Sequence, residues 1–153
     1  MTYEITDFMD IHVTVKPSLQ LYATKDFMGK AMPGIAIQLV QITGDGTEDY
    51  YGMLTVSFGE FIGMKNCAYI DANNCDFIDQ LLKQGMATPT GLSKHSGFCE
   101  YPLWKFDEEK LKEMGEEAYK VYSDAYDQYM SSAYDPEEYE DVCKKIDSLE
   151  MSM

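Results

Sequence analysis

Arginine is missing from this 153-residue chain, and all twelve of its basic side chains are lysine. Arginine supplies the planar, forked set of donors that recognition of phosphate and guanine favours. We therefore expect no direct nucleic-acid partner.

Long apolar segments are missing as well. No run approaches the roughly 18 to 20 apolar residues that a membrane span requires. The beginning of the chain, MTYEITDFMDIH, is acidic and lacks the basic and apolar parts of a signal peptide. These absences predict a cytoplasmic protein without a membrane partner.

Side chains that commonly bind metals are few and poorly spaced. The four cysteines form no CxxC pair, and there are two histidines. A zinc site made of Cys67, Cys75, His95 and Cys99 would have spacings that fit no usual ligand pattern. The sequence predicts reduced, mostly buried thiols, no metal and no cofactor.

The chain nevertheless contains enough apolar material for one folded domain. Hydrophobic residues make up 45% of the sequence, which allows folding in spite of a net charge of −15. The charge is uneven, because residues 107–153 hold 15 acidic residues and 5 lysines, whereas residues 1–106 hold 12 and 7. We expect an α+β body over 1–106 and an acidic two-helix segment over 107–153, packed on the body or extending from it.

Alternation of apolar and polar residues predicts a sheet in the body, antiparallel or mixed. The residues on either side of Pro17 suggest an opening hairpin, because the proline interrupts the alternation. The best strand pair is 34–42 with 51–58, joined through an Asp-Gly turn. A further strand is expected over 66–71.

One helix is expected to cover this sheet near 74–84, capped by one of two asparagines and ended by Gly85. Residues 87–97 are rich in turn formers and lack periodicity, which predicts a loop. Pro102 confines the apolar run that follows to an edge strand or an irregular strand.

The acidic end has helical periodicity. Asp107 is a suitable N-cap, and at about 100° per residue the apolar side chains fall opposite the acidic ones. The predicted apolar stripe consists of Leu111, Met114, Ala118, Val121, Tyr122, Ala125 and Tyr129. Tyr119 and Tyr126 lie at its margin. A second helix is predicted to begin at Pro136, and the two helices form a hairpin.

Two segments, NCAYIDANNC and PTGLSKHSGFCEYPLWKFDEEKL, carry a more specific pattern. The residues concerned are Asn66, Ala68, Ile70, Asp71, Asn73, Asn74, Cys75, Pro89, Thr90, Gly91, Ser96, Gly97, Phe98, Cys99, Tyr101, Pro102, Leu103, Phe106 and Asp107. In them the chain resembles a family of domains of unknown function, number 4313, associated with conjugative and phage-like elements of bacteria. The likeness runs roughly from Ile35 to Leu111. It implies a setting, mobile DNA in a bacterial cytoplasm, and no activity.

The polar turn at Asp71, Asn73 and Asn74 resembles the start of a calcium loop. However, Cys75 and Asp76 stand where a further ligand and the turn glycine would be needed. A strand end followed by a helix cap explains these residues better.

Lys94 and His95 lie in the expected polar loop, where they could contact an anion or act as acid and base. An exposed loop tip is the simpler interpretation. A catalytic histidine needs a partner, yet His12 lies in an expected strand and no serine or cysteine lies in a nucleophile motif. We expect no enzymatic activity.

The acidic helices suggest a binding surface. Its candidate residues are Glu109, Glu113, Glu116, Glu117, Asp124, Asp127, Glu137, Glu138, Glu140 and Asp141. Carboxylates on a rigid scaffold can imitate the phosphates of DNA and occupy the basic groove of a nucleic-acid-binding enzyme. One helix carries only about one charge per 5 Å, against one per roughly 1.7 Å in a duplex, so two helices together could imitate a strand.

With the mobile-element setting, this surface predicts a non-catalytic protein that binds a basic partner. The expected partner is a host-defence nuclease or another nucleic-acid-binding effector, as for anti-CRISPR and anti-restriction inhibitors. Three alternatives stay open. The acidic faces could serve only solubility; the Lys94-His95 loop could belong to a small enzyme or ligand-binding domain; or the protein could be a structural accessory of a conjugative element that forms a homodimer through its helical end.

Overall fold

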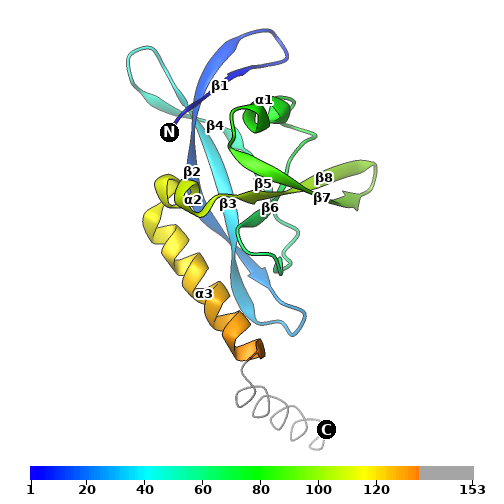
Figure 1. Ribbon diagram of the computed structural model, residues 1–153. Coiled ribbons are helices and arrows are strands. Elements are labelled where there is room, and N and C mark those ends of the chain that lie inside the picture. Colours follow the sequence, from blue (N-terminus) through cyan, green and yellow to red (C-terminus); the bar gives the residue numbers. More distant parts are fainter. Residues whose placement is uncertain (135–153) are drawn as a thin grey trace, which may run out of the picture.

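The computed structural model describes residues 1–134, which form two four-stranded antiparallel sheets and three helices (Figure 1). The sheet orders are β1-β2-β3-β4 and β5-β6-β8-β7. The elements are β1 (Tyr3–Thr6), β2 (His12–Lys25), β3 (Ala31–Ile42), β4 (Glu48–Met53), β5 (Thr55–Val56), β6 (Cys67–Ile70), α1 (Ile78–Lys83), β7 (Ala87–Ser96), β8 (Cys99–Phe106), α2 (Glu108–Met114) and α3 (Glu116–Tyr134). The predicted α+β class is confirmed, although the strands divide into two sheets instead of one.

The strand β2 is continuous, so the predicted hairpin around Pro17 is wrong. Pro17 pairs with Leu39 of β3 in the middle of the strand. β1 pairs only with residues 12–15 of β2, so beyond Val15 one edge of β2 has no paired strand within residues 1–134. A residue without an N–H group is tolerated next to such an open edge.

The predicted strand 51–58 is divided between the two sheets at Leu54. β3 and β4 pair as expected, across a turn in which Gly46 has φ +84°. Leu54 is fully buried, its N–H donates to the carbonyl of Ile37 (2.9 Å), and its carbonyl accepts the N–H of Asp71 (2.9 Å). The chain therefore leaves the first sheet and enters the second at one hydrogen-bonded residue.

Residues 87–97 form β7 and its turn into β8, so the predicted loop is wrong. β7 is the outer strand of the second sheet and is largely exposed, so it has no buried face to produce an alternating pattern. A register shift between Pro89 and Ser93 accommodates its turn-forming residues. β8 is a central strand instead of an edge, and it tolerates Pro102 because β6 pairs only with residues 103–105.

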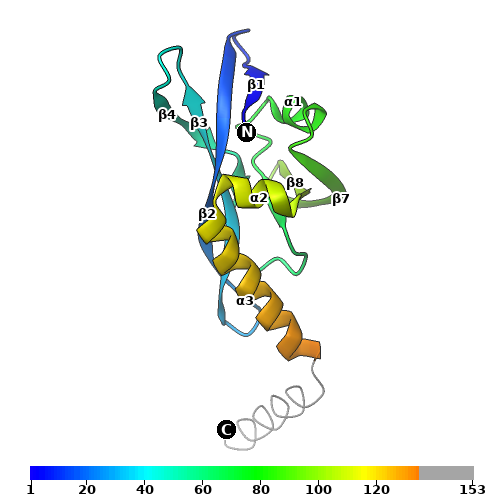
Figure 2. The ribbon, with the colours of Figure 1, turned by 60° about the vertical axis from the view of Figure 1, so that its left-hand side comes forward.

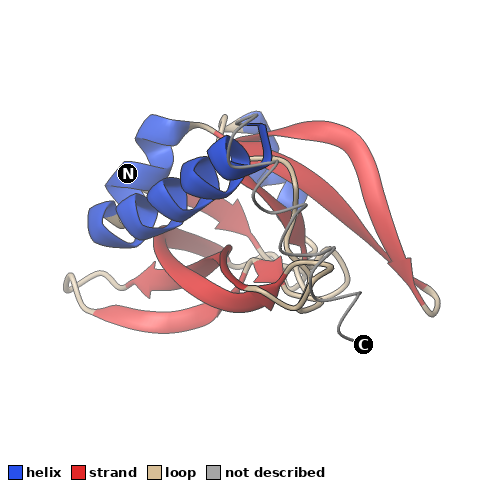
Figure 3. Ribbon diagram, turned by 90° about the horizontal axis from the view of Figure 1, so that it is seen from below, coloured by secondary structure: helices blue, strands red, loops and turns tan. Residues whose placement is uncertain are grey.

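Over residues 107–134, the described part of the acidic end, the chain forms two helices where one continuous helix was predicted before Pro136. The backbone is extended at Gly115 (φ −180°, ψ 96°), and a Cβ there would lie 3.0 Å from the carbonyl oxygen of Leu19. The break lets α2 and α3 pack against the first sheet (Figures 2 and 3). It also rotates the buried stripe of α3 relative to the predicted one. Tyr119 and Tyr126, expected at the margin, are 2% and 6% exposed, whereas Val121, expected on the stripe, is 57% exposed.

α1 is shorter than predicted and has no asparagine cap, although it ends at the predicted glycine. The side chains of Gln80 in α1 and of Gln84 directly after it form hydrogen bonds with the backbone of β1, as a neighbouring strand would. Thr6 N–H donates to Gln80 Oε1 (2.7 Å) and Gln80 Nε2 donates to the Thr6 carbonyl (2.8 Å). Gln84 forms the same two bonds with Glu4 (3.0 and 2.6 Å). These four bonds fasten α1 to the first sheet.

One core joins both sheets and the three helices. Trp104 and Phe106 of β8 are among its largest fully buried side chains, and α2 and α3 add Leu111 and Tyr122. The helix predicted from Pro136 lies outside the described residues. The predicted division of the chain after residue 106 stays a prediction.

Candidate functional site

The outer faces of α2 and α3 carry the predicted binding carboxylates. All six that fall within the described chain are exposed, namely Glu109, Glu113, Glu116, Glu117, Asp124 and Asp127. The other four, Glu137, Glu138, Glu140 and Asp141, lie outside the described residues. Tyr119, Tyr122 and Tyr126 form the buried face of α3, whereas its carboxylates are exposed.

Lysines neutralise part of this acidic outer face. Lys65 Nζ lies 2.8 Å from Asp127 Oδ1, and Lys112 Nζ lies 3.6 Å from Glu108 Oε1 and 3.7 Å from Glu109 Oε1. Four carboxylates of the face have no ion pair within residues 1–134: Glu113, Glu116, Glu117 and Asp124. The uncompensated charge thus lies at the end of α2 and along the first half of α3.

The inner face of α3 is a ladder of three tyrosines. The ring centroids of Tyr119 and Tyr122 are 6.1 Å apart, and those of Tyr122 and Tyr126 are 6.0 Å apart. Tyr126 Oη donates to the carbonyl of Gly63 (3.0 Å), Tyr122 Oη accepts the N–H of Asn66 (2.9 Å), and Tyr119 Oη donates to Asn66 Oδ1 (3.0 Å). Burial raises the pKa of Tyr122. The tyrosine ladder therefore holds the chain that precedes β6.

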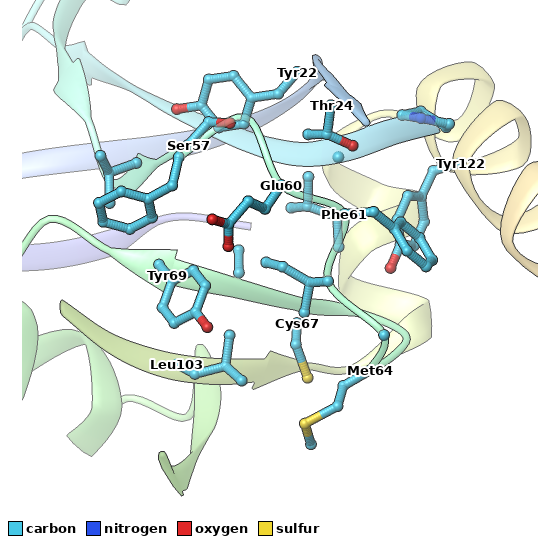
Figure 4. A pocket seen from close by; sticks show the side chains of 18 of the residues that line it. Tyr22, Thr24, Ser57, Glu60, Phe61, Met64, Cys67, Tyr69, Leu103 and Tyr122 are labelled. Atoms are coloured by element: carbon cyan, nitrogen blue, oxygen red, sulfur yellow. The ribbon is translucent and has the colours of Figure 1, made fainter. Parts of the chain in front are cut away.

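That stretch of chain borders a cavity of about 350 Å³ between the two sheets (Figure 4). Its wall comes from the ends of β2 and β3, from β6 and β8, and from Tyr122 of α3. Most lining side chains are apolar, and Glu60 is the one charged residue among those that line the cavity in the described chain. Sequence patterns did not indicate this site, because its residues come from separate segments.

Lys94 and His95 lie on β7, and successive side chains of a strand point to opposite faces. Lys94 Nζ lies 2.7 Å from Glu60 Oε2 and 4.7 Å from the ring centroid of Phe58. His95 is exposed, with Nε2 3.9 Å from Glu100 Oε1. The structure therefore does not bring the two residues together as an acid and a base.

Asp71, Asn73 and Asn74 form the turn between β6 and α1. Asn74 Nδ2 donates to Asp71 Oδ2 (2.8 Å), and the Cys75 N–H donates to the Asp71 carbonyl (2.9 Å). The two asparagines do not cap a helix, because α1 begins only at Ile78. The predicted cap is wrong, while the bonds within the turn give Asp71 and Asn74 a structural role.

The cysteines of the described chain are free thiols. Cys67 and Cys75 are buried, Cys99 is partly exposed, and burial raises the pKa of Cys75 to about 11. Among residues 1–134, no three His, Cys, Asp or Glu side chains lie together as a metal site would require. In the same part of the chain, no helix has the length and apolar character needed to cross a membrane.

Two four-stranded antiparallel sheets around one core, with helices that carry an acidic outer face, define a small α+β protein. The family model described as "Domain of unknown function (DUF4313)" matches residues 26–126. The chain belongs to this family, as the resemblance predicted. The match continues past Leu111 into α3, so the likeness extends further into the acidic end than we expected. No curated protein and no solved structure matches the chain.

Proposed function

We propose that this protein is a non-catalytic binding protein that engages a basic protein partner through the acidic outer face of α2 and α3. The supporting observation is the division of α3 into two faces. Tyr119, Tyr122 and Tyr126 are buried. Glu116, Glu117 and Asp124 are exposed and have no ion pair within residues 1–134. Charges that hold no part of this fold together are available to steer a partner of opposite charge.

The setting implied by the resemblance suggests the class of partner. A mobile element in a bacterial cytoplasm encounters host nucleases, whose nucleic-acid grooves are basic. We therefore propose a defence nuclease or another nucleic-acid-binding effector as the target, with inhibition of the anti-CRISPR or anti-restriction kind.

The charge density limits what such a surface can imitate. From Glu116 to Asp127, α3 spans about 17 Å at 1.5 Å per residue, whereas a duplex carries one charge per roughly 1.7 Å. Over that length, three carboxylates without an ion pair within residues 1–134 can replace the phosphates in only part of a nucleic-acid-binding groove. The hairpin predicted to continue from Pro136 would add Glu137, Glu138, Glu140 and Asp141 to the same surface.

A charge-neutralised variant tests this proposal. It carries Glu113→Gln, Glu116→Gln, Glu117→Gln and Asp124→Asn, and it leaves Asp127 paired with Lys65. The matched control removes four exposed carboxylates of the body, through Asp10→Asn, Asp49→Asn, Asp76→Asn and Asp79→Asn. Capture from bacterial lysate at low salt identifies the partner, and association rates are then measured for all three proteins.

The outer-face variant should associate about tenfold more slowly than wild type at low salt, and the control should not. The difference should shrink as salt lowers the screening length from about 10 Å at 0.1 M to about 3 Å at 1 M. Stability should change little, because exposed carboxylates contribute little to folding. Unaltered association and inhibition by the outer-face variant would show that the acidic face serves solubility instead.

A further inference from the structure

The opening of the cavity beside β7 combines a carboxylate, aromatic rings and one ammonium group. Lys94 Nζ is ion-paired with Glu60 and at the same time lies over the Phe58 ring. Tyr69 and Tyr101 flank Phe58 edge to face, with ring centroids 5.6 and 5.1 Å from it. A carboxylate beside aromatic rings is an arrangement that favours organic cations. Here a lysine of the same chain occupies it.

The space next to this group is suited to an apolar body. The cavity volume of about 350 Å³ is at the lower end of the range for small-molecule sites. Ile35, Val56, Met64 and Leu103 contribute apolar wall, and Figure 4 shows Glu60 reaching in beside Tyr69. The wall thus offers apolar surface and a single negative charge.

We infer that this cavity binds a small organic cation. The apolar body of the ligand fills the cavity, and its ammonium group lies at Glu60 and Phe58, where it displaces Lys94. The site faces the inner side of α3, through Tyr122, so it is separate from the acidic outer face. Either proposal can fail without affecting the other.

Displacement of Lys94 is inexpensive. The Lys94 side chain is 28% exposed and the Glu60 side chain 71% exposed, so water reaches the carboxylate and screens the ion pair. Lys94 excludes a ligand only while it occupies the site. The apparent affinity for the ligand is therefore the intrinsic affinity multiplied by the fraction of time for which Lys94 is out of the site. For an ion pair whose carboxylate is largely exposed and whose ammonium group has one ring contact, this penalty is about fivefold.

The experiment uses n-hexylammonium as the probe, with 1-hexanol and hexanoate as its neutral and anionic counterparts. Each is titrated into the full chain and followed by amide chemical shifts in β5, β6 and β7. The cation should bind saturably and most tightly, and hexanoate least. Lys94→Met should bind the cation about fivefold more tightly than wild type. Glu60→Gln should abolish the preference for the cation over the alcohol.

Lys16→Met is the matched control, because it removes the same charge and breaks an exposed ion pair, with Glu48 at 3.3 Å, outside the cavity. It should bind all three probes as wild type does. Equal affinity for cation and alcohol in Lys94→Met, or the same gain in Lys16→Met, would overturn the inference. If Lys94→Met does not fold, the order of the three probes in wild type and its loss in Glu60→Gln decide the question.

Discussion

Replacing Tyr122 with phenylalanine should lower the free energy of unfolding by about 1–2 kcal/mol. The side chain is 3% exposed, and its hydroxyl accepts the Asn66 N–H at 2.9 Å. The substitution keeps the ring of the tyrosine ladder and leaves that N–H without its acceptor. An unsatisfied buried donor costs about 1–3 kcal/mol, offset in part because phenylalanine has no hydroxyl to desolvate. Urea unfolding with an unchanged m value measures the loss.

The stability difference between wild type and Tyr122→Phe should also depend on pH. Burial raises the pKa of Tyr122 in the folded protein above its unfolded value of about 10. The stability that this group contributes is therefore fully present below pH 10 and is lost as pH rises through the folded pKa. Above pH 10 the unfolding free energy of wild type should fall by up to about 1.4 kcal/mol per pH unit through this group. The variant lacks the hydroxyl and should not show this loss. The two stabilities should converge there.

Tyr50→Phe is the matched control, because Tyr50 is 65% exposed. It should change the unfolding free energy by less than about 0.5 kcal/mol. If Tyr122→Phe costs no more than this control at pH 7, or if its difference from wild type does not narrow above pH 10, the Tyr122 hydroxyl does not hold the chain before β6.

Two further substitutions test how the helices are attached. Gln80→Ala should lower the unfolding free energy by about 1–2 kcal/mol and speed amide exchange in β1, because it removes two bonds to that strand. The exposed Gln128→Ala on α3 should change stability by less than about 0.5 kcal/mol. Gly115→Ala should cost about 1–3 kcal/mol in thermal unfolding, because the new Cβ would meet a backbone oxygen of β2 at 3.0 Å. An unchanged thermal unfolding of Gly115→Ala would show that α2 and α3 can shift on the sheet to make room for the methyl group.

Local sequence patterns were sufficient to predict several features of this protein. The Asp-Gly turn and the alternation around it predicted the pairing of β3 with β4, and the acidic, 3.6-residue pattern after Asp107 predicted helices. Such patterns arise because one face of an element is buried, and a short window of sequence contains that information. For the same reason the exposed carboxylates of α2 and α3 could be named from the sequence.

Other features depended on position in the sheets. β7 has no buried face, so its sequence resembles a loop even though β8 pairs with it. Pro17 and Pro102 looked like strand breakers, and each is tolerated because a neighbouring strand ends beside it. Whether an N–H group is needed at a residue depends on which strand lies next to it, and that neighbour is remote in the sequence.

The sequence by itself therefore determined the α+β class, the family and the acidic outer face. Tertiary structure alone decided that Tyr119 and Tyr126 are buried beside Tyr122, because the extended Gly115 fits against Leu19 and rotates α3. It alone also created the cavity, where Glu60 and Lys94 meet across 34 residues of chain. Such contacts depend on how two sheets pack against each other, and no local window of sequence contains that packing.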